Sequence, residues 1–189
     1  MTRQESSIQL AFHHRIAMPL DIPAINDLIN ISITENMKPY LSAKEIEAAK
    51  ETMGVDRTLI EDGTYFIIEK TIGNKSLMVG CGGWGKRKTL YGGDHTVGRD
   101  DSLSDPTTDA ARIRAMYSLP AWTRKGIGAL LLKLGEEAAR NAGFNTIELG
   151  STISGEALYL KCGYKELSRE ILIANNGSEN LIITMSKQF

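Results

Sequence analysis

The fold of this chain is decided by the stretch Ala111-Arg-Ile-Arg-Ala-Met-Tyr-Ser-Leu-Pro-Ala-Trp-Thr-Arg-Lys-Gly-Ile-Gly-Ala-Leu-Leu132. We expect residues 112–119 to form a strand, and the apolar periodicity of residues 126–141 predicts a long amphipathic helix that Gly143 ends. Its expected inward side chains are Ile127, Leu130, Leu131, Leu134 and Ala138, and its expected outward ones are Lys133, Glu136, Glu137 and Arg140.

The loop between this strand and helix has the composition of an anion site. Gly126 and Gly128 let the backbone approach a bulky anion, because neither carries a Cβ. The first helical turn has unpaired N–H groups and partial positive charge, which suits a pyrophosphate. Arg124 and Lys125 add charge nearby. Taken alone, a Gly-x-Gly pattern more often marks a plain turn, and this one is too short for a Walker nucleotide loop.

The rest of the chain alternates between strand-like and helix-like segments. The expected strands are 8–17, 64–70, 76–84, 112–119, 145–149, 164–174 and 180–186, and the expected helices start after Asp21, at Ser42, at Gly126 and at Ser154. This order predicts one domain over residues 1–189, of the α/β (α+β) class. Residues 90–109 show no periodicity, which leaves open a functional or a mobile loop.

Composition excludes several classes of function. With 42% hydrophobic and 24% charged residues, the 189-residue chain has a globular profile, and its net charge of −1 argues against a nucleic-acid partner. No apolar run is long enough for a membrane span, and the N-terminus lacks signal-peptide features. Cys81 and Cys162 lie in apolar segments without metal-type spacing, so we expect free thiols, a cytoplasmic location and no bound metal.

The stretch from residue 111 to 132 strongly resembles the coenzyme A-binding core of the GNAT acetyltransferase superfamily, and the element order is similar to that fold from about Ile8 onward. The resemblance implies a mixed, mostly antiparallel twisted sheet of about six or seven strands with helices on both faces. It also implies that strand backbone groups bind the pantetheine arm and that loop positions bind the pyrophosphate. The residues carried over are Tyr117, Ser118, Arg124, Lys125, Gly126, Ile127, Gly128 and Ala129.

One position departs from the family pattern. Three residues before the first glycine the family usually has Arg or Gln, and this chain has Thr123. Because most of the expected contacts to the pyrophosphate come from backbone N–H groups, we expect binding to survive the change. Thr123 therefore puts the affinity for coenzyme A in doubt, not the identity of the ligand.

A second resemblance lies in Leu158-Tyr-Leu-Lys-Cys-Gly-Tyr164, which is similar to the short helix before the family's last hairpin. There a tyrosine four residues before the glycine often protonates the departing coenzyme A thiolate, and Tyr159 has that position. A phenol with a pKa of about 10 is suited to the role. The alternative is that Tyr159 only packs as an amphipathic aromatic residue.

The general base cannot be identified from the sequence. The expected strand 112–119 carries Arg112 and Arg114 and no acid. Asp94 and His95 in the long loop are the best remaining candidates, although solvated loop residues are the commoner interpretation of both.

The resemblance implies an acyltransferase that moves an acetyl group from acetyl-CoA, its donor substrate, to a small-molecule amine or a peptide. Transfer would be direct, in a ternary complex, with Tyr159 as general acid. Three alternatives stay open: another acyl group, a different acceptor, or a non-catalytic coenzyme A-binding or sensing module. The sequence also leaves a homodimer open.

Overall fold

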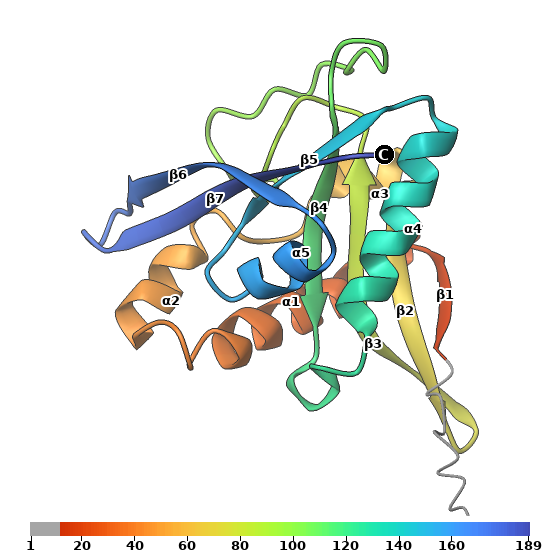
Figure 1. The fold of residues 1–189 in the computed structure, drawn as a ribbon. Coiled ribbons are helices and arrows are strands. Elements are labelled where there is room, and N and C mark those ends of the chain that lie inside the picture. Colours follow the sequence, from red (N-terminus) through yellow and green to blue (C-terminus); the bar gives the residue numbers. More distant parts are fainter. Residues whose placement is uncertain (1–11) are drawn as a thin grey trace, which may run out of the picture.

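The computed structural model describes residues 12–189 and consists of one seven-stranded sheet with helices on both faces (Figure 1). In chain order the elements are β1 (His13–Ile16), η1 (Pro19–Asp21), α1 (Ile22–Asn36), α2 (Ala43–Ala49), α3 (Arg57–Glu61), β2 (Tyr65–Ile72), β3 (Lys75–Gly85), β4 (Ala111–Ser118), η2 (Pro120–Trp122), α4 (Ile127–Asn141), β5 (Thr146–Ser151), α5 (Glu156–Lys161), β6 (Lys165–Ile173) and β7 (Glu179–Gln188).

The sheet has the strand order β1-β2-β3-β4-β5-β7-β6. Every neighbouring pair is antiparallel except β4 and β5, which run parallel. The expected fold class, with a mostly antiparallel sheet and helices on both faces, is therefore confirmed. The parallel pair is joined through α4, because parallel neighbours need a long crossover connection.

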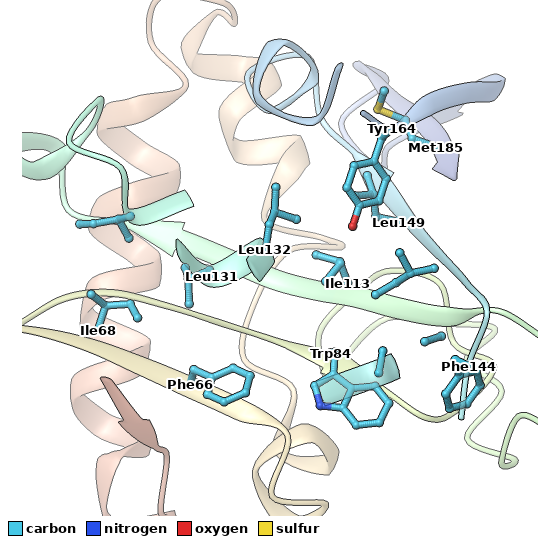
Figure 2. Packing of buried hydrophobic residues seen from close by; sticks show 14 of the residues in the cluster. Phe66, Ile68, Trp84, Ile113, Leu131, Leu132, Phe144, Leu149, Tyr164 and Met185 are labelled. Atoms are coloured by element: carbon cyan, nitrogen blue, oxygen red, sulfur yellow. The ribbon is translucent and has the colours of Figure 1, made fainter. Parts of the chain in front are cut away.

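Two apolar clusters hold the helices to the two faces of the sheet. One cluster contains α4 residues such as Leu131 and Leu132 packed on Trp84, Ile113 and Phe144 (Figure 2). The other packs α1, α2 and α3 on the opposite face, around Tyr65, Ile67, Cys81 and Tyr117. Helix α4 lies close to β3 because glycines face it: a Cβ on Gly80 would lie 2.5 Å from Ile127 Cγ2.

The local signals in the sequence correspond well to these elements. Ser42 and Glu45 form the expected capping box at the start of α2, where the Ser42 side chain accepts a hydrogen bond from the Glu45 N–H. The predicted helix after Ser42 ends earlier than expected, at Ala49. A separate five-residue helix, α3, was not predicted, since so short an element shows no periodicity. Part of the first expected strand, residues 8–11, lies outside the described residues.

One prediction for α4 was wrong. Glu136 points inward and is buried, where it accepts a hydrogen bond from Tyr164 Oη (3.1 Å) and forms an ion pair with Lys187 Nζ (2.8 Å). Its partners lie on the C-terminal strands, so helical periodicity alone indicated the solvent face. The long loop, 86–110, is also ordered by many side-chain contacts that are described below.

No helix within residues 12–189 is long and apolar enough to cross a membrane.

Candidate active site between β4 and β5

The sheet opens between its two parallel strands. Strands β4 and β5 share only two residue pairs, Ala111 with Ile147 and Arg112 with Glu148. Beyond these pairs the strands separate, although both continue for several residues (Figure 1). Backbone groups on the facing edges are therefore left without a strand partner, which is unusual in the middle of a sheet.

A β-bulge in β4 lies beside this opening. The register between β3 and β4 shifts between Cys81 and Gly83, and Ala115 has a left-handed φ of 50°. The hydroxyl of Tyr65, on β2, which lies on the far side of β3, donates a hydrogen bond to the Ala115 carbonyl (2.8 Å). Non-glycine residues seldom adopt positive φ, and bulges turn strands at functional sites, so the buried Tyr65 fixes a conformation that directs β4 away from β5.

A pocket lies at the opening between β4 and β5. Its lining comes from β4 and β5, from α5 on one face and from two loops on the other, and consists of Thr52, Met53, Gly54, Leu90, Tyr91, Gly92, Ile113, Arg114, Ala115, Met116, Tyr117, Leu149, Gly150, Thr152, Tyr159 and Ile182. Tyr159 packs with the α4 cluster, whereas Met53 packs with the α1–α3 cluster. Two molecules could therefore reach the same point from opposite faces.

The start of α4 has the features of an anion site. Gly126 is the N-cap residue with φ 91°, and Arg124 has φ 62°. The first backbone bond of the helix runs from Leu130 N to Gly126 O (3.0 Å), and no side chain caps the end. The N–H groups of the first three helical residues, Ile127, Gly128 and Ala129, therefore lack helical partners. Such an end, preceded by two left-handed residues, binds anions such as a pyrophosphate.

The two glycines of this loop are needed for different physical reasons. Gly126 has a left-handed backbone (φ 91°) that favours glycine, whereas space is not limiting, since a Cβ there would meet no atom within 4 Å. A Cβ on Gly128 would instead lie 2.6 Å from Leu158 Cδ2. Gly128 thus lets the first turn of α4 pack against α5. This packing role was not predicted from the sequence. This packing sets Tyr159, the residue after Leu158, near the start of α4.

The basic and polar side chains of the loop are accessible. Arg124 and Lys125 are exposed, and the Lys125 ammonium lies 4.6 Å from the Trp122 ring centroid. Thr123, the departure from the family pattern, donates its hydroxyl proton to the Pro120 carbonyl (3.0 Å). That bond closes the turn before the helix, so Thr123 has a local role in the shape of the loop.

The two strand residues expected to bind the pantetheine arm lie at the end of β4. The Ser118 carbonyl accepts a hydrogen bond from Asn36 Nδ2 (2.8 Å). Because Leu119 N bonds to Val79 O (3.0 Å), alternation along the ladder turns the Ser118 N–H away from β3 and toward the opening. Tyr117 points its side chain to the other face, where its hydroxyl accepts a hydrogen bond from the Gly54 N–H.

Tyr159 lies in the pocket lining and is half-buried. Its ring contacts Tyr164 edge-on, with centroids 5.9 Å apart. Burial, with a smaller contribution from Cys162, raises the pKa of Tyr159 to about 12. Among residues 12–189 its hydroxyl has no hydrogen-bond partner. It therefore holds its proton at neutral pH and is free to donate it within the pocket.

The two residues considered as a general base lie outside the pocket lining. Asp94 accepts the Arg57 N–H (2.8 Å) and forms an ion pair with the Arg57 guanidinium (3.2 Å). His95 is exposed, and its Nε2 lies 2.9 Å from the Lys50 carbonyl oxygen. Within the described chain no Asp, Glu or His lines the pocket, and no group of three or more His, Cys, Asp or Glu side chains could hold a metal ion.

Sequence reasoning missed a buried ion cluster beside the pocket. Arg114, on β4, forms an ion pair with Asp56 (2.7 Å), and Arg99, from the long loop, pairs with the other oxygen of the same carboxylate (3.1 Å). Burial lowers the pKa of Arg114, while Asp56 acts in the opposite direction. An arginine within an apolar strand was the available signal, because a buried guanidinium requires a partner.

Comparison with known proteins places these features in a family. Residues 61–166 match the model of the acetyltransferase (GNAT) domain, which covers more than half of the chain. No curated protein sequence matches the chain.

Solved structures of similar fold agree with this match. A GCN5-related N-acetyltransferase from Rhodopseudomonas palustris has a TM-score of 0.66 at 19% identity, with 94% of this chain and 95% of that chain covered. The PaiA N-acetyltransferase from Thermoplasma acidophilum, in complex with coenzyme A, has a TM-score of 0.59 at 14% identity, with 95% and 99% covered. YncA, a putative acetyltransferase from Salmonella typhimurium with acetyl-CoA, has a TM-score of 0.60 at 17% identity, with 94% of each chain covered. The fold is shared, and by the domain match the chain belongs to the GNAT acetyltransferase family.

Proposed function

We propose that the protein is an N-acetyltransferase that transfers the acetyl group of acetyl-CoA directly to an amine in a ternary complex. The observation that carries this proposal is the pocket at the opening between β4 and β5, which has Tyr159 on one side and a separate wall of two loops on the other. The uncapped start of α4 packs against Leu158, the residue before Tyr159. Neighbours in fold hold coenzyme A or acetyl-CoA, which supports the choice of donor.

The residues at the α4 end suit the donor. The free N–H groups of Ile127, Gly128 and Ala129 would bind the pyrophosphate, with Arg124 and Lys125 adding charge. The Ser118 N–H would bond to an amide of the pantetheine arm at the open edge of β4, as an added strand would. The thioester would then lie in the opening, near Tyr159.

The chemistry moves protons at both the nitrogen and the sulfur. The ammonium form of the acceptor first loses one proton to solvent, and the neutral amine nitrogen attacks the thioester carbonyl carbon. The nitrogen loses a second proton to solvent, the C–S bond of the intermediate breaks, and Tyr159 gives its proton to the leaving sulfur and regains one from solvent. For an alkyl amine with a pKa near 10.4, deprotonation at pH 7 costs about 4.6 kcal/mol. Holding both reactants in the opening would supply much of the remaining acceleration.

Two measurements test this function in sequence. Calorimetry with coenzyme A and acetyl-CoA comes first, and no binding at millimolar concentration would exclude the donor site. Thiol release is then followed with acetyl-CoA and a panel of alkyl amines, amino acids and short peptides. We expect acetyl-CoA to bind and at least one acceptor class to accelerate thiol release. Longer acyl donors in the same assay test the choice of acetyl.

The lining of the pocket favours one second candidate, a non-catalytic coenzyme A-binding module. Because none of its described residues is a carboxylate or a histidine, the pocket itself offers no evident base. Acetyl-CoA binding without thiol release for any acceptor would support this candidate over the transferase.

A further inference from the structure

The buried ion cluster consists of Asp56, Arg99 and Arg114, and it lies directly behind one wall of the pocket. The side chains of Asp56 and Arg114 are 1% and 3% exposed. Charges this deeply buried are costly unless every polar atom is paired. Asp56 meets this requirement with Arg114 and Arg99, and it also accepts the Thr58 N–H (3.1 Å) as the N-cap of α3.

Apart from an ion pair between Arg99 and the Asp101 carboxylate (3.0 Å), the other guanidinium contacts of the cluster go to main-chain carbonyls of the long loop. Arg114 donates to the Thr89 carbonyl (3.0 Å) and to the Gly92 carbonyl (2.6 Å). Arg99 donates to the carbonyls of Gly92 (3.3 Å) and Gly93 (3.1 Å). The cluster therefore holds the backbone on both sides of the two residues between Thr89 and Gly92.

Those two residues, Leu90 and Tyr91, form part of the pocket wall. Tyr91 also lies against β5, because a Cβ on Gly150 would be 3.1 Å from Tyr91 Cβ. The wall thus spans the opening from Arg114 on β4 to Gly150 on β5. It belongs to the face opposite the start of α4, where an acceptor would enter.

The second loop of this wall depends on the same carboxylate. Residues 52–54 line the pocket, and Asp56 lies two residues after Gly54. Two backbone bonds join this segment to the long loop, from Gly93 N to Thr52 O (2.9 Å) and from Asp94 N to Val55 O (2.9 Å). Both loops of the acceptor side therefore converge on Asp56 and its two arginines.

We propose that Asp56, Arg99 and Arg114 are positioning residues that fix the acceptor-side wall, so that Arg114 controls acceptor binding and turnover without contributing to donor affinity. This inference rests on the proposed transferase function. A displacement of about 1 Å in a reactant can cost about 10²-fold in rate, so a wall held by a few carbonyl contacts is a sensitive point.

The test is Arg114→Met, which keeps most of the side-chain length and removes every donor. We expect the Kd for acetyl-CoA to change less than about threefold, while kcat/KM for the best acceptor of the panel falls about 10²-fold or more. Measured separately, the acceptor KM should be raised and kcat lowered, whereas the KM for acetyl-CoA should be unchanged. Unchanged acceptor kinetics in the folded variant would overturn the proposal.

Two further variants separate positioning from general stability. Arg87→Met removes a similar arginine that binds Asp62 (2.8 Å) and the Asp101 carbonyl (2.8 Å) in the same loop but away from the pocket. We expect near wild-type acceptor kinetics from it, and a loss equal to that of Arg114→Met would count against the proposal. Asp56→Asn combined with Arg114→Met removes both charges of the buried pair, while Arg99 keeps the Asp101 carboxylate (3.0 Å) as its partner. This double variant should recover stability and remain defective toward the acceptor.

Hydrogen exchange gives a readout that does not need an acceptor. In Arg114→Met, amides of the 89–93 segment should exchange at least about tenfold faster than in the wild type, and those of α4 should not. If the wild type binds no acetyl-CoA or releases no thiol, the proposed function fails while this exchange still tests the wall. Unchanged protection of the 89–93 segment would then overturn the inference.

Discussion

At the residue scale, the proposed mechanism depends on one phenol, Tyr159, whose surroundings set its protonation state. Tyr164, next to Tyr159, is also buried, but its hydroxyl is bound to Glu136. Tyr159 lines the pocket, and its hydroxyl has no such partner among the described residues. Because burial raises its pKa to about 12, Tyr159 is protonated at neutral pH, as the proposed role of general acid requires.

Tyr159→Phe should therefore lower kcat by about 10²–10⁴-fold with little change in acetyl-CoA affinity, because only the proton donor is lost. Steady-state kinetics and calorimetry measure the two effects. Tyr164→Phe is the matched control, since it removes a neighbouring buried hydroxyl that points to Glu136; it should lower stability and leave kcat largely intact. An unaffected kcat in Tyr159→Phe would remove this residue from the mechanism.

Gly126 offers a second test at this scale. Replacing it by Ala places a Cβ on a backbone with φ 91°, which costs about 1–2 kcal/mol or drives the loop out of its shape. Gly63→Ala is the control, because Gly63 also has positive φ (69°) and open space around it but lies far from the pocket lining. Both variants should lose similar thermal stability, and only Gly126→Ala should weaken acetyl-CoA binding in calorimetry, by about tenfold or more. Equal affinities would argue against an anion site at α4.

At the scale of the elements, close approach of backbones explains the glycine-rich end of β3. A Cβ on Gly83 would lie 2.3 Å from the Thr64 carbonyl oxygen and 2.9 Å from Tyr65 Cα, which are main-chain atoms that cannot move aside. Gly85, two residues further on, would place its Cβ 3.5 Å from Leu59 Cδ2, an ordinary contact. The two glycines therefore differ in what surrounds them, although they share a strand and a face.

Gly83→Ala should consequently lower the free energy of unfolding by about 1–3 kcal/mol or more, whereas Gly85→Ala should change it by no more than about 0.5 kcal/mol. Urea unfolding of both variants followed by circular dichroism measures the difference. Similar destabilisation by the two substitutions would show that overpacking against β2 is not the cause.

Local patterns were enough to predict most elements, and long-range contacts explain where they were not. The β4–loop–α4 unit, the capping box at Ser42 and the order of seven strands follow from periodicity and turn residues close together in sequence. The inward Glu136 and the pairing of Asp56 with Arg114 join residues 51 and 58 positions apart, so no local pattern contains them. The ion cluster behind the pocket wall could not be predicted for this reason.

At the scale of the whole molecule, burial of ionisable hydroxyl and thiol groups controls the response to alkaline pH. Burial raises the pKa of Cys81 to about 12 and that of Tyr159 to about 12, and it also raises the pKa values of Tyr65, Tyr117 and Tyr164. These groups keep their protons in the folded state at pH values where the unfolded chain has lost them. Their contribution to stability is complete below about pH 8.5 and is lost as pH rises toward 12.

The free energy of unfolding should therefore decrease from about pH 9 upward, by up to about 1.4 kcal/mol per pH unit for each group that ionises only in the unfolded chain. Urea midpoints at pH 7.5, 9, 10 and 11 measure the slope. Cys81→Ala should reduce the slope of stability against pH between pH 9 and 10, because in the unfolded chain the thiol ionises at a lower pH than the tyrosine hydroxyls. A constant midpoint up to pH 11 would contradict the assignment.

The short contact between β4 and β5 has a mechanical consequence. Strands β1–β4 and strands β5–β7 form two half-sheets that share only the pairs at Ala111 and Arg112. At the far end, the tip of the β6–β7 hairpin is latched to the α2 region, where Asn175 N bonds to the Glu51 carboxylate (3.0 Å) and Asn180 Nδ2 bonds to the Ala48 carbonyl (3.0 Å). If the opening widened, the two half-sheets would rotate about the paired end and these two hydrogen bonds would be strained. The contacts at the hairpin tip therefore limit how far the half-sheets can separate.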